Sequence, residues 1–309
     1  MCVPGGQAAI ALIYFAFTGS DAHVLLPESA YGPNGELANH LLARFGVKTE
    51  LYDPLIGGGI TKLIRTNTRL IWCESPCSVT MEVQDVPAIT AAARHAGVTT
   101  ALDNTYAAGV LLDAFAHGAD DVTMQALTKY VGGHSDLLLG SVTVRDEAHY
   151  RALADAHSLL GMSVSPDDCS FALRGLQTLA VRLRQLEENT LAVAGWLREQ
   201  PEIGAVLHPA FPDCPGHDTW ARDFTGSASV FSFVFEPSIQ PDAIVRLFDE
   251  LALFPVGYSW GGVTSLAMPY FNLQRRYHFH NGKVVRFNIG KEKAEDLIAD
   301  LERGFVALQ

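Results

Sequence analysis

A single lysine stands between an apolar run and a pair of glycines near the middle of the chain. Lys129 follows Thr128 and precedes Gly132 and Gly133, in a protein with only 22 lysine and arginine residues among 309. The run before it, 122–126, has the composition of a buried strand. An amine held by rigid backbone and partly shielded from water can lose its proton and act as a nucleophile or base. A Thr-Lys pair at such a junction is also common as a purely structural feature, so a catalytic interpretation of Lys129 requires other residues that fit the same chemistry.

The first supporting residue is an acid at the end of the preceding strand. Asp103 closes the apolar run 98–102, one crossover before Lys129. Open α/β sheets bind ligands at the C-terminal ends of their strands. A lysine and a carboxylate at that edge suit pyridoxal phosphate (PLP), whose aldehyde forms a Schiff base with an amine and whose ring nitrogen needs a carboxylate to stay protonated. We therefore interpret Lys129 as the Schiff-base lysine and Asp103 as the partner of the ring nitrogen.

The chain opens on a glycine turn that leads into an apolar helix. Gly5 and Gly6 precede Gln7 and an alanine-rich run. Amides at a buried helix start bind anions, so the amides of Gly6 and Gln7 are candidates for holding a phosphate, although an ordinary helix start has the same pattern. The motif is not GxGxxG and no Walker lysine follows it, which disfavours a nucleotide.

Three other positions could reach the same site. Tyr31 lies in a turn after strand 23–26, where its ring could stack on a cofactor and its phenol could act as acid or base, or where it could simply cover the core. Arg286 lies inside the apolar strand 284–289, and burial there requires an anion, either a substrate carboxylate or an acid of the chain. The glycine-rich turn 258–262 carries Ser259 and Trp260.

Charge and cysteine content restrict the function class. The formal net charge is −12, which disfavours nucleic-acid and anionic-membrane partners. Five scattered cysteines predict reduced thiols in a cytoplasm. The apolar run 8–17 lacks the flanks of a signal peptide and is too short to span a bilayer. His278 and His280 could share one side of a strand, but no third ligand neighbours them, so we expect no metal site.

The fold that must position these residues is α/β. Apolar strands without period-two alternation alternate with helices in the first half, which predicts a mostly parallel sheet covered by helices on both faces, with strand 137–144 antiparallel or at an edge. A long helical stretch at 166–198 leads into a smaller α+β domain. We predict a PLP-binding domain at 1–178 and a small C-terminal domain at 179–309.

Several separate motifs, in order along the chain, resemble those of the PLP-dependent trans-sulfuration enzymes of cysteine and methionine metabolism. The branch that the chain resembles most is that of the bacterial cystathionine β-lyases. The motifs are Pro4-Gly5-Gly6-Gln7-Ala8-Ala9, Glu74-Ser75-Pro76, Asp103-Asn104-Thr105, Thr128-Lys129-Tyr130, Gly133-His134-Ser135-Asp136, Tyr258-Ser259-Trp260-Gly261-Gly262 and the run 286–290. The resemblance implies the PLP-dependent transferase fold of aspartate aminotransferase type (fold type I).

The resemblance also implies a role for each site residue. Catalysis falls to Lys129 and Tyr31, which move protons, and Tyr31 also stacks on the cofactor ring. The cofactor is held by Lys129, by Asp103 at the ring nitrogen, and at its phosphate by the amides of Gly6 and Gln7 with the hydroxyl of Thr128. The substrate is held by Arg286 and Ser259 at its α-carboxylate and by Trp260 at its side chain. Where many relatives carry a serine, this chain has Ala126.

The implied activity is β-elimination of L-cystathionine, or of related cysteine S-conjugates, to homocysteine or another thiol, pyruvate and ammonia, within methionine biosynthesis. A γ-acting relative is the alternative, which would release 2-oxobutyrate, but the turn at Trp260 favours β-elimination. Family members carry an N-terminal arm that contacts the phosphate of a neighbouring subunit, and this chain begins at the glycine turn. Either the chain is a truncated form, or its start is misplaced, or another contact substitutes for the arm; without a substitute we expect weakened PLP binding and a looser oligomer. Because the sites of the family lie at subunit interfaces, the resemblance implies a homo-oligomer, dimer or tetramer. A catalytically weak remnant is the third hypothesis.

Overall fold

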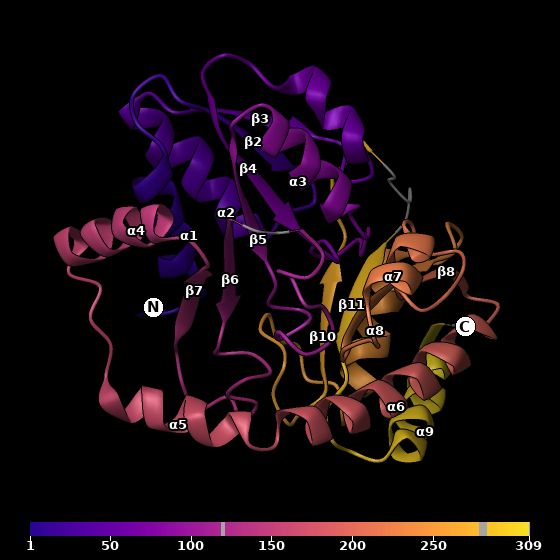
Figure 1. Ribbon diagram of the computed structural model, residues 1–309. Helices are drawn as coiled ribbons and strands as arrows, with labels where there is room; N and C mark the ends of the chain where they lie inside the picture. Colours follow the sequence, from indigo (N-terminus) through magenta and orange to yellow (C-terminus); the bar gives the residue numbers. More distant parts are fainter. Residues whose placement is uncertain (119–120, 278–282, 309) are drawn as a thin grey trace.

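A computed structural model describes residues 1–118, 121–277 and 283–308, and within these ranges the chain forms two sheets (Figure 1). The larger has seven strands in the order β1-β7-β6-β5-β4-β2-β3, and the smaller has four in the order β10-β11-β9-β8. The strands of the large sheet are β1 (Cys2–Val3), β2 (His23–Pro27), β3 (Lys48–Tyr52), β4 (Thr68–Glu74), β5 (Thr99–Asp103), β6 (Val122–Ala126) and β7 (Gly140–Val144).

The large sheet is parallel except at one edge. Strands β3, β2, β4, β5 and β6 pair in parallel, whereas β7 is antiparallel to β6 and β1 is antiparallel to β7. Neighbouring residues of one strand enter different cores: Ile71 and Cys73 pack on one side of the sheet, and Leu70 and Trp72 on the other. Both faces are therefore buried, which explains the unbroken apolar strands. The predicted mostly parallel sheet and its antiparallel strand are confirmed.

Helices cover both faces of this sheet. Helices α1 (Gly6–Phe17) and α4 (Glu147–Leu160) contribute to one core, and α3 (Val86–His95) and α5 (Pro166–Leu176) to the other. The apolar spacing of residues 34–45 fits one continuous helix, but the structure does not form one. The segment consists of α2 (Gly32–Glu36), a π-helical turn (Leu37–Leu41) and a 3-10 turn (Leu42–Phe45), and it ends on Gly46 at φ 83°. Apolar spacing alone does not distinguish these widened and tightened turns from an α-helix.

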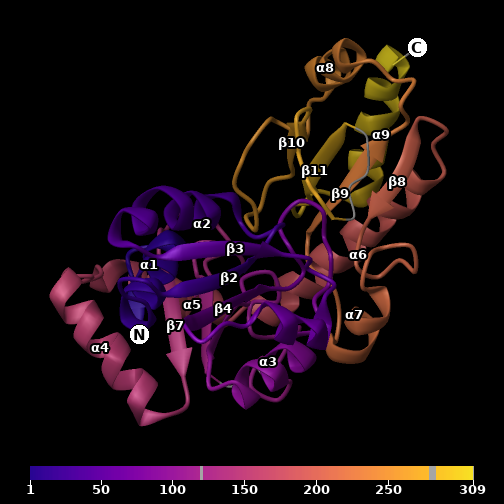
Figure 2. The ribbon, with the colours of Figure 1, turned by 90° about the horizontal axis from the view of Figure 1, so that it is seen from above.

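The smaller sheet is antiparallel and is covered on one face by helices. Its strands are β8 (Ile203–Leu207), β9 (Val230–Phe235), β10 (Leu266–Tyr270) and β11 (Val284–Asn288), and α8 (Pro241–Glu250) and α9 (Ala294–Phe305) pack on it. Figure 2 shows this sheet with α8 and α9 at one end of the molecule. Phe231, Phe233 and Phe287 form the centre of this core.

Helix α6 (Leu179–Arg198) contributes buried residues to the cores of both sheets. Leu183 near its start packs in a core of the large sheet, whereas Val193 and Leu197 pack in the core of the small one. A division of the chain at 178/179 stays a prediction, because one helix shares buried residues with both cores.

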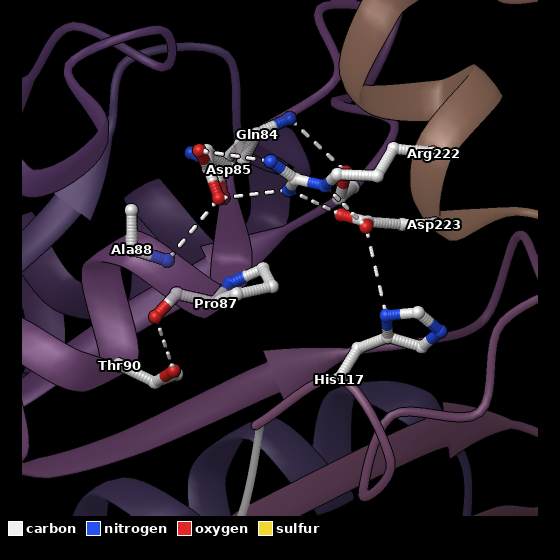
Figure 3. A network of polar contacts seen from close by, with 9 residues as sticks. Gln84, Asp85, Pro87, Ala88, Thr90, His117, Arg222 and Asp223 are labelled. Carbon is white, nitrogen blue, oxygen red and sulfur yellow. Dashed lines mark hydrogen bonds and ion pairs between the residues drawn. The ribbon is translucent and has the colours of Figure 1, made fainter.

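A second connection between the two halves is polar (Figure 3). Arg222, on α7 (His217–Asp223), donates from Nη2 to Oδ1 of Asp85 at 2.9 Å and from Nε to Oδ1 of Asp223 at 2.6 Å. Asp85 also caps α3 by accepting from the Ala88 amide at 3.1 Å, and His117 lies 3.5 Å from Asp223. A segment that follows β8 is thereby fastened to the start of a helix of the large sheet.

The turn that carries Lys129 is held from α6 by a buried arginine. Arg182 donates from Nη1 to the carbonyl of Tyr130 at 2.6 Å and from Nη2 to the carbonyls of Val131, at 3.2 Å, and Gly175, at 2.8 Å. Gly133, at φ +70°, has room for no side chain, since a Cβ there would lie 2.0 Å from Nη1 of Arg182. The glycine pair after Lys129 thus admits the guanidinium that fixes the turn.

We expect Arg182→Leu to lower the free energy of unfolding by roughly 3–5 kcal/mol, because the buried carbonyls of Tyr130 and Val131 lose their donor. Urea unfolding followed by circular dichroism measures the change. Arg184 lies exposed on the same helix, so Arg184→Leu is the matched control and should change stability by less than about 0.5 kcal/mol. Equal losses in the two variants would contradict this role for Arg182.

Candidate active site

A cavity of about 400 Å³ opens where the C-terminal ends of β4, β5 and β6 meet the start of α1 and the turn 258–262. All nine residues singled out from the sequence line it: Gly6, Gln7, Tyr31, Asp103, Thr128, Lys129, Ser259, Trp260 and Arg286. They come from both sheets and from positions up to 280 residues apart. The structure therefore brings the whole predicted set together.

The amine of Lys129 is partly shielded and tied to the second half of the chain. Its Nζ donates to Oγ of Ser259 at 2.6 Å and lies 4.9 Å from the ring centre of Trp260. Burial lowers the pKa of Lys129 to about 8, and the positive charge of Arg286 acts in the same direction while Asp103 opposes it. A substantial fraction of the amine is therefore neutral near physiological pH, as a nucleophile or base requires.

Asp103 ends β5 and is held by a residue that the sequence analysis left without a role. Its Oδ1 accepts from the amide of Thr105 at 3.0 Å and from the Thr105 hydroxyl at 2.5 Å. The same hydroxyl accepts from the amide of Ala126 at 2.9 Å. Burial raises the pKa of Asp103, and the Thr105 hydrogen bonds and Lys129 counteract it. A hydroxyl two residues after an acid at a strand end is the signal that could have identified Thr105.

A second acid ends the neighbouring strand. Oε2 of Glu74 accepts from the Tyr31 amide at 2.7 Å and so holds the backbone of that turn. Burial, together with the nearby Asp103, raises the pKa of Glu74 to about 8. Burial also raises the pKa of the Tyr31 phenol, with smaller contributions from Tyr258 and Asp103 in the same direction.

The glycine turn leaves donors free at the start of α1. Gly5 adopts φ 113°, and the first hydrogen bond within the helix runs from the Ala9 amide to the Gly5 carbonyl at 3.2 Å. The amides of Gly6 and Gln7 therefore have no acceptor within the helix. A Cβ on Gly6 would lie 2.8 Å from Cβ of Ala126, so only glycine fits. Gly6 and Gln7 both line the cavity, so these donors lie where an anion site requires them.

Thr128 is the predicted phosphate ligand that would use a hydroxyl, and this hydroxyl already makes two hydrogen bonds within the protein. The hydroxyl donates to the carbonyl of Leu139 at 3.1 Å and accepts from the Leu139 amide at 3.0 Å. A hydroxyl has one proton, so donation to a phosphate requires that Thr128 release this carbonyl. Its role at a phosphate stays a prediction.

Arg286 is buried on β11 with 6% of its surface exposed. Its Nη2 donates to the carbonyl of Tyr258 at 2.5 Å, and the guanidinium lies 5.4 Å and 5.7 Å from the ring centres of Tyr258 and Tyr270. Within the described part of the chain these contacts include no carboxylate. The buried charge is therefore available to an anionic ligand, and the alternative of a salt bridge finds no partner among the described residues.

The cavity offers an amine, a buried acid and a nest of free amides on its walls, which fit the aldehyde, ring nitrogen and phosphate of PLP. The family model for Cys/Met metabolism PLP-dependent enzymes matches residues 1–306. The chain belongs to this family. Its cofactor is pyridoxal 5′-phosphate, which confirms that prediction.

The similar proteins include several lyases. A putative cystathionine β-lyase of Rhizobium johnstonii is 41% identical over 99% of this chain and 78% of its own length. The cystathionine β-lyase of Escherichia coli is 41% identical over 99% of this chain and 79% of its own. Among solved structures, the cystathionine γ-synthase of Xanthomonas oryzae superposes with a TM-score of 0.90 at 28% identity, covering 100% of this chain and 81% of that one. The predicted fold type is confirmed.

No group of three or more histidine, cysteine or acidic side chains that could hold a metal occurs in the described ranges, and His278 and His280 lie outside them. None of the helices within the described residues is long and apolar enough to cross a membrane.

The opposing charges around Lys129 give a prediction for the apoenzyme. We expect Arg286→Gln to raise the Lys129 pKa above about 8, since it removes a neighbouring cation, and Asp103→Asn to lower it, since it removes an anion. The extent of acetic anhydride labelling of the Lys129 peptide, measured by mass spectrometry across pH, reports each midpoint. Arg184→Gln is the control, since Arg184 is exposed and does not line the cavity. Midpoints that do not move in opposite directions would refute this account.

Proposed function

We propose that this protein is a PLP-dependent carbon–sulfur lyase that cleaves L-cystathionine, or related cysteine S-conjugates, by β-elimination. The products would be a thiol (homocysteine from cystathionine), pyruvate and ammonia, as part of methionine biosynthesis. The observation that carries the proposal is the convergence, in one cavity, of a lysine with a lowered pKa, a buried aspartate and an arginine without a carboxylate partner in the described chain. The 41% identity to cystathionine β-lyases supports the β-lyase branch.

Four groups of residues would hold the cofactor. Lys129 would bond its aldehyde carbon, Asp103 would face its ring nitrogen, and Tyr31 would cover its ring. The amides of Gly6 and Gln7, with Thr128, would bind its phosphate. Bound PLP supplies an electron sink beside the α-carbon of an amino acid.

The remaining residues would bind the substrate and move its protons. Arg286, with the hydroxyl of Ser259, would bind the α-carboxylate and so orient the Cα–H bond. Tyr31 would accept a proton from the substrate ammonium. The substrate amine would displace Lys129 from the aldehyde carbon, and the amine of Lys129 freed in this way would take the α-proton and then protonate the leaving sulfur. A pKa near 8 suits both steps, because the same group must act as base and then as acid. Trp260 would bound the space for the sulfur substituent.

Assembly and location are proposed on other grounds. We infer a homo-oligomer, dimer or tetramer, from the family resemblance. We infer a cytoplasmic location because all five cysteines are free thiols, as a reducing compartment favours.

The test combines a spectrum with product identification. We expect the purified chain with PLP to show a visible absorption band that Lys129→Ala lacks, because the band comes from the Schiff base and the variant has no amine at this position to form it. With L-cystathionine the wild type should release pyruvate, measured with lactate dehydrogenase, and Lys129→Ala should release none above background. Release of 2-oxobutyrate instead would assign the γ-acting alternative. A band without turnover on any thioether would leave a cofactor-binding protein and overturn the lyase proposal.

A further inference from the structure

A buried hydrogen-bond network connects the residue after Lys129 to the second sheet. The phenol of Tyr130 meets Oγ of Ser229 at 2.9 Å and accepts from the Ser229 amide at 3.0 Å. The Ser229 hydroxyl in turn donates to Oδ1 of Asn288, on β11, at 2.8 Å. Tyr130, Ser229 and Asn288 are all at most 2% exposed. None of these three side chains was assigned a role from the sequence.

The amide of Asn288 is also the anchor of the turn 258–262. Its Oδ1 accepts from the Gly261 amide at 3.0 Å, and its Nδ2 donates to the Thr264 carbonyl at 2.9 Å. These partners, with the Ser229 hydroxyl, fix which end of the side-chain amide is oxygen, because two donors converge on one atom and a carbonyl faces the other. The network leaves no room for an alternative orientation of this asparagine.

The turn that Asn288 anchors lies directly against Lys129. Gly261 adopts φ +85°, and a Cβ there would lie 3.1 Å from the Cα and Cβ of Lys129. The ring of Trp260 packs on that of Tyr130 with centres 5.3 Å apart, and Ser259 accepts the hydrogen bond of Lys129. The turn and the lysine therefore contact each other through backbone, ring and hydroxyl at once.

Asn288 and Arg286 are two residues apart on one strand, so their side chains project from the same face. Arg286 donates to the carbonyl of Tyr258, the first residue of the same turn. One strand thus holds both ends of the turn and carries the arginine.

We propose that Asn288 is a positioning residue that sets the register of the turn 258–262, and with it Ser259 and Trp260, against Lys129. It does so without touching the substrate or cofactor itself. Only the expected effect on kcat/KM rests on the proposed function. The hydroxyl of Ser259 and the guanidinium of Arg286 can bind one substrate carboxylate only if the turn keeps its place on β11. The role of Asn288 in holding the turn does not depend on that function.

The first experiment uses the apoenzyme and hydrogen–deuterium exchange read by mass spectrometry. Asn288→Leu keeps the side-chain size but removes the acceptor of the Gly261 amide. We expect exchange in the peptide that spans 258–262 to rise by about tenfold, the factor for loss of one hydrogen bond. Unchanged exchange in this peptide would overturn the proposal.

The matched control is Asn189→Leu. Asn189 is also buried, at 6% exposure, and donates from Nδ2 to the Glu292 carbonyl at 2.8 Å, but its hydrogen bonds within the described residues reach neither the turn nor Lys129. We expect it to lower the melting temperature as Asn288→Leu does, while exchange at 258–262 stays within about twofold of wild type. An equal rise in exchange at 258–262 in both variants would mean that Asn288 acts only through overall stability, against the proposal.

The second experiment uses the enzyme loaded with PLP. We expect Asn288→Leu to keep the visible band, since Lys129 and Asp103 are intact, but to lose roughly 10- to 100-fold in kcat/KM for cystathionine. Loss of the band together with activity would contradict a role confined to the turn. Should Asn288→Leu not fold, Ser229→Ala removes one of the two donors to Asn288, and a rise in exchange at 258–262 is again required. If the wild type shows no turnover, the lyase proposal fails while the exchange result still decides the role of Asn288.

Discussion

The contact of Lys129 with the turn 258–262 is the interaction on which the site depends. The lysine belongs to the large sheet and the turn to the small one, and no strand pairing joins the two sheets within the described residues. The hydrogen bond to Ser259, the packing of Gly261 on the lysine backbone and the contact of Trp260 with Tyr130 replace that pairing. They also remove water from the amine, and this desolvation is the largest cause of its lowered pKa. The same contact thus lowers the pKa of Lys129 and joins the two sheets.

The large sheet contributes a different constraint. Because both of its faces are buried, its central strands β4, β5 and β6 expose polar groups only near their ends, and parallel pairing brings the C-terminal ends to one edge. Glu74 and Asp103 are direct partners in the register of β4 and β5, which places two carboxyls side by side. Mutual repulsion and burial keep a proton on Glu74 up to about pH 8. Near neutral pH it can therefore support Tyr31 without adding a second full negative charge beside Asp103.

Much of the site could be predicted from the sequence, because its residues are unfavourable in the local structures that surround them. A lysine after a buried strand, an arginine inside an apolar strand and a glycine pair before an apolar helix are each costly unless they serve a ligand. The residues that hold them obey local rules and gave no such signal. Ser229 and Asn288 are ordinary polar residues until a hydrogen bond between positions 59 residues apart places them together. The same limit explains the segment 34–45, where apolar spacing fits three kinds of helical turn.

The charges of the cavity suggest how a protein with a net charge of −12 binds anionic ligands. Arg286 has no carboxylate partner among the described residues, and the first amides of α1 have no acceptor within their helix. These two donor sets belong to different elements, β11 and the start of α1, and both line the cavity. Asp103 is the carboxylate that stays available to a cationic ring nitrogen, because Thr105 and Lys129 counteract the effect of its burial. Local pairing of each buried charge with a ligand group, rather than the overall charge, therefore determines what this site can hold.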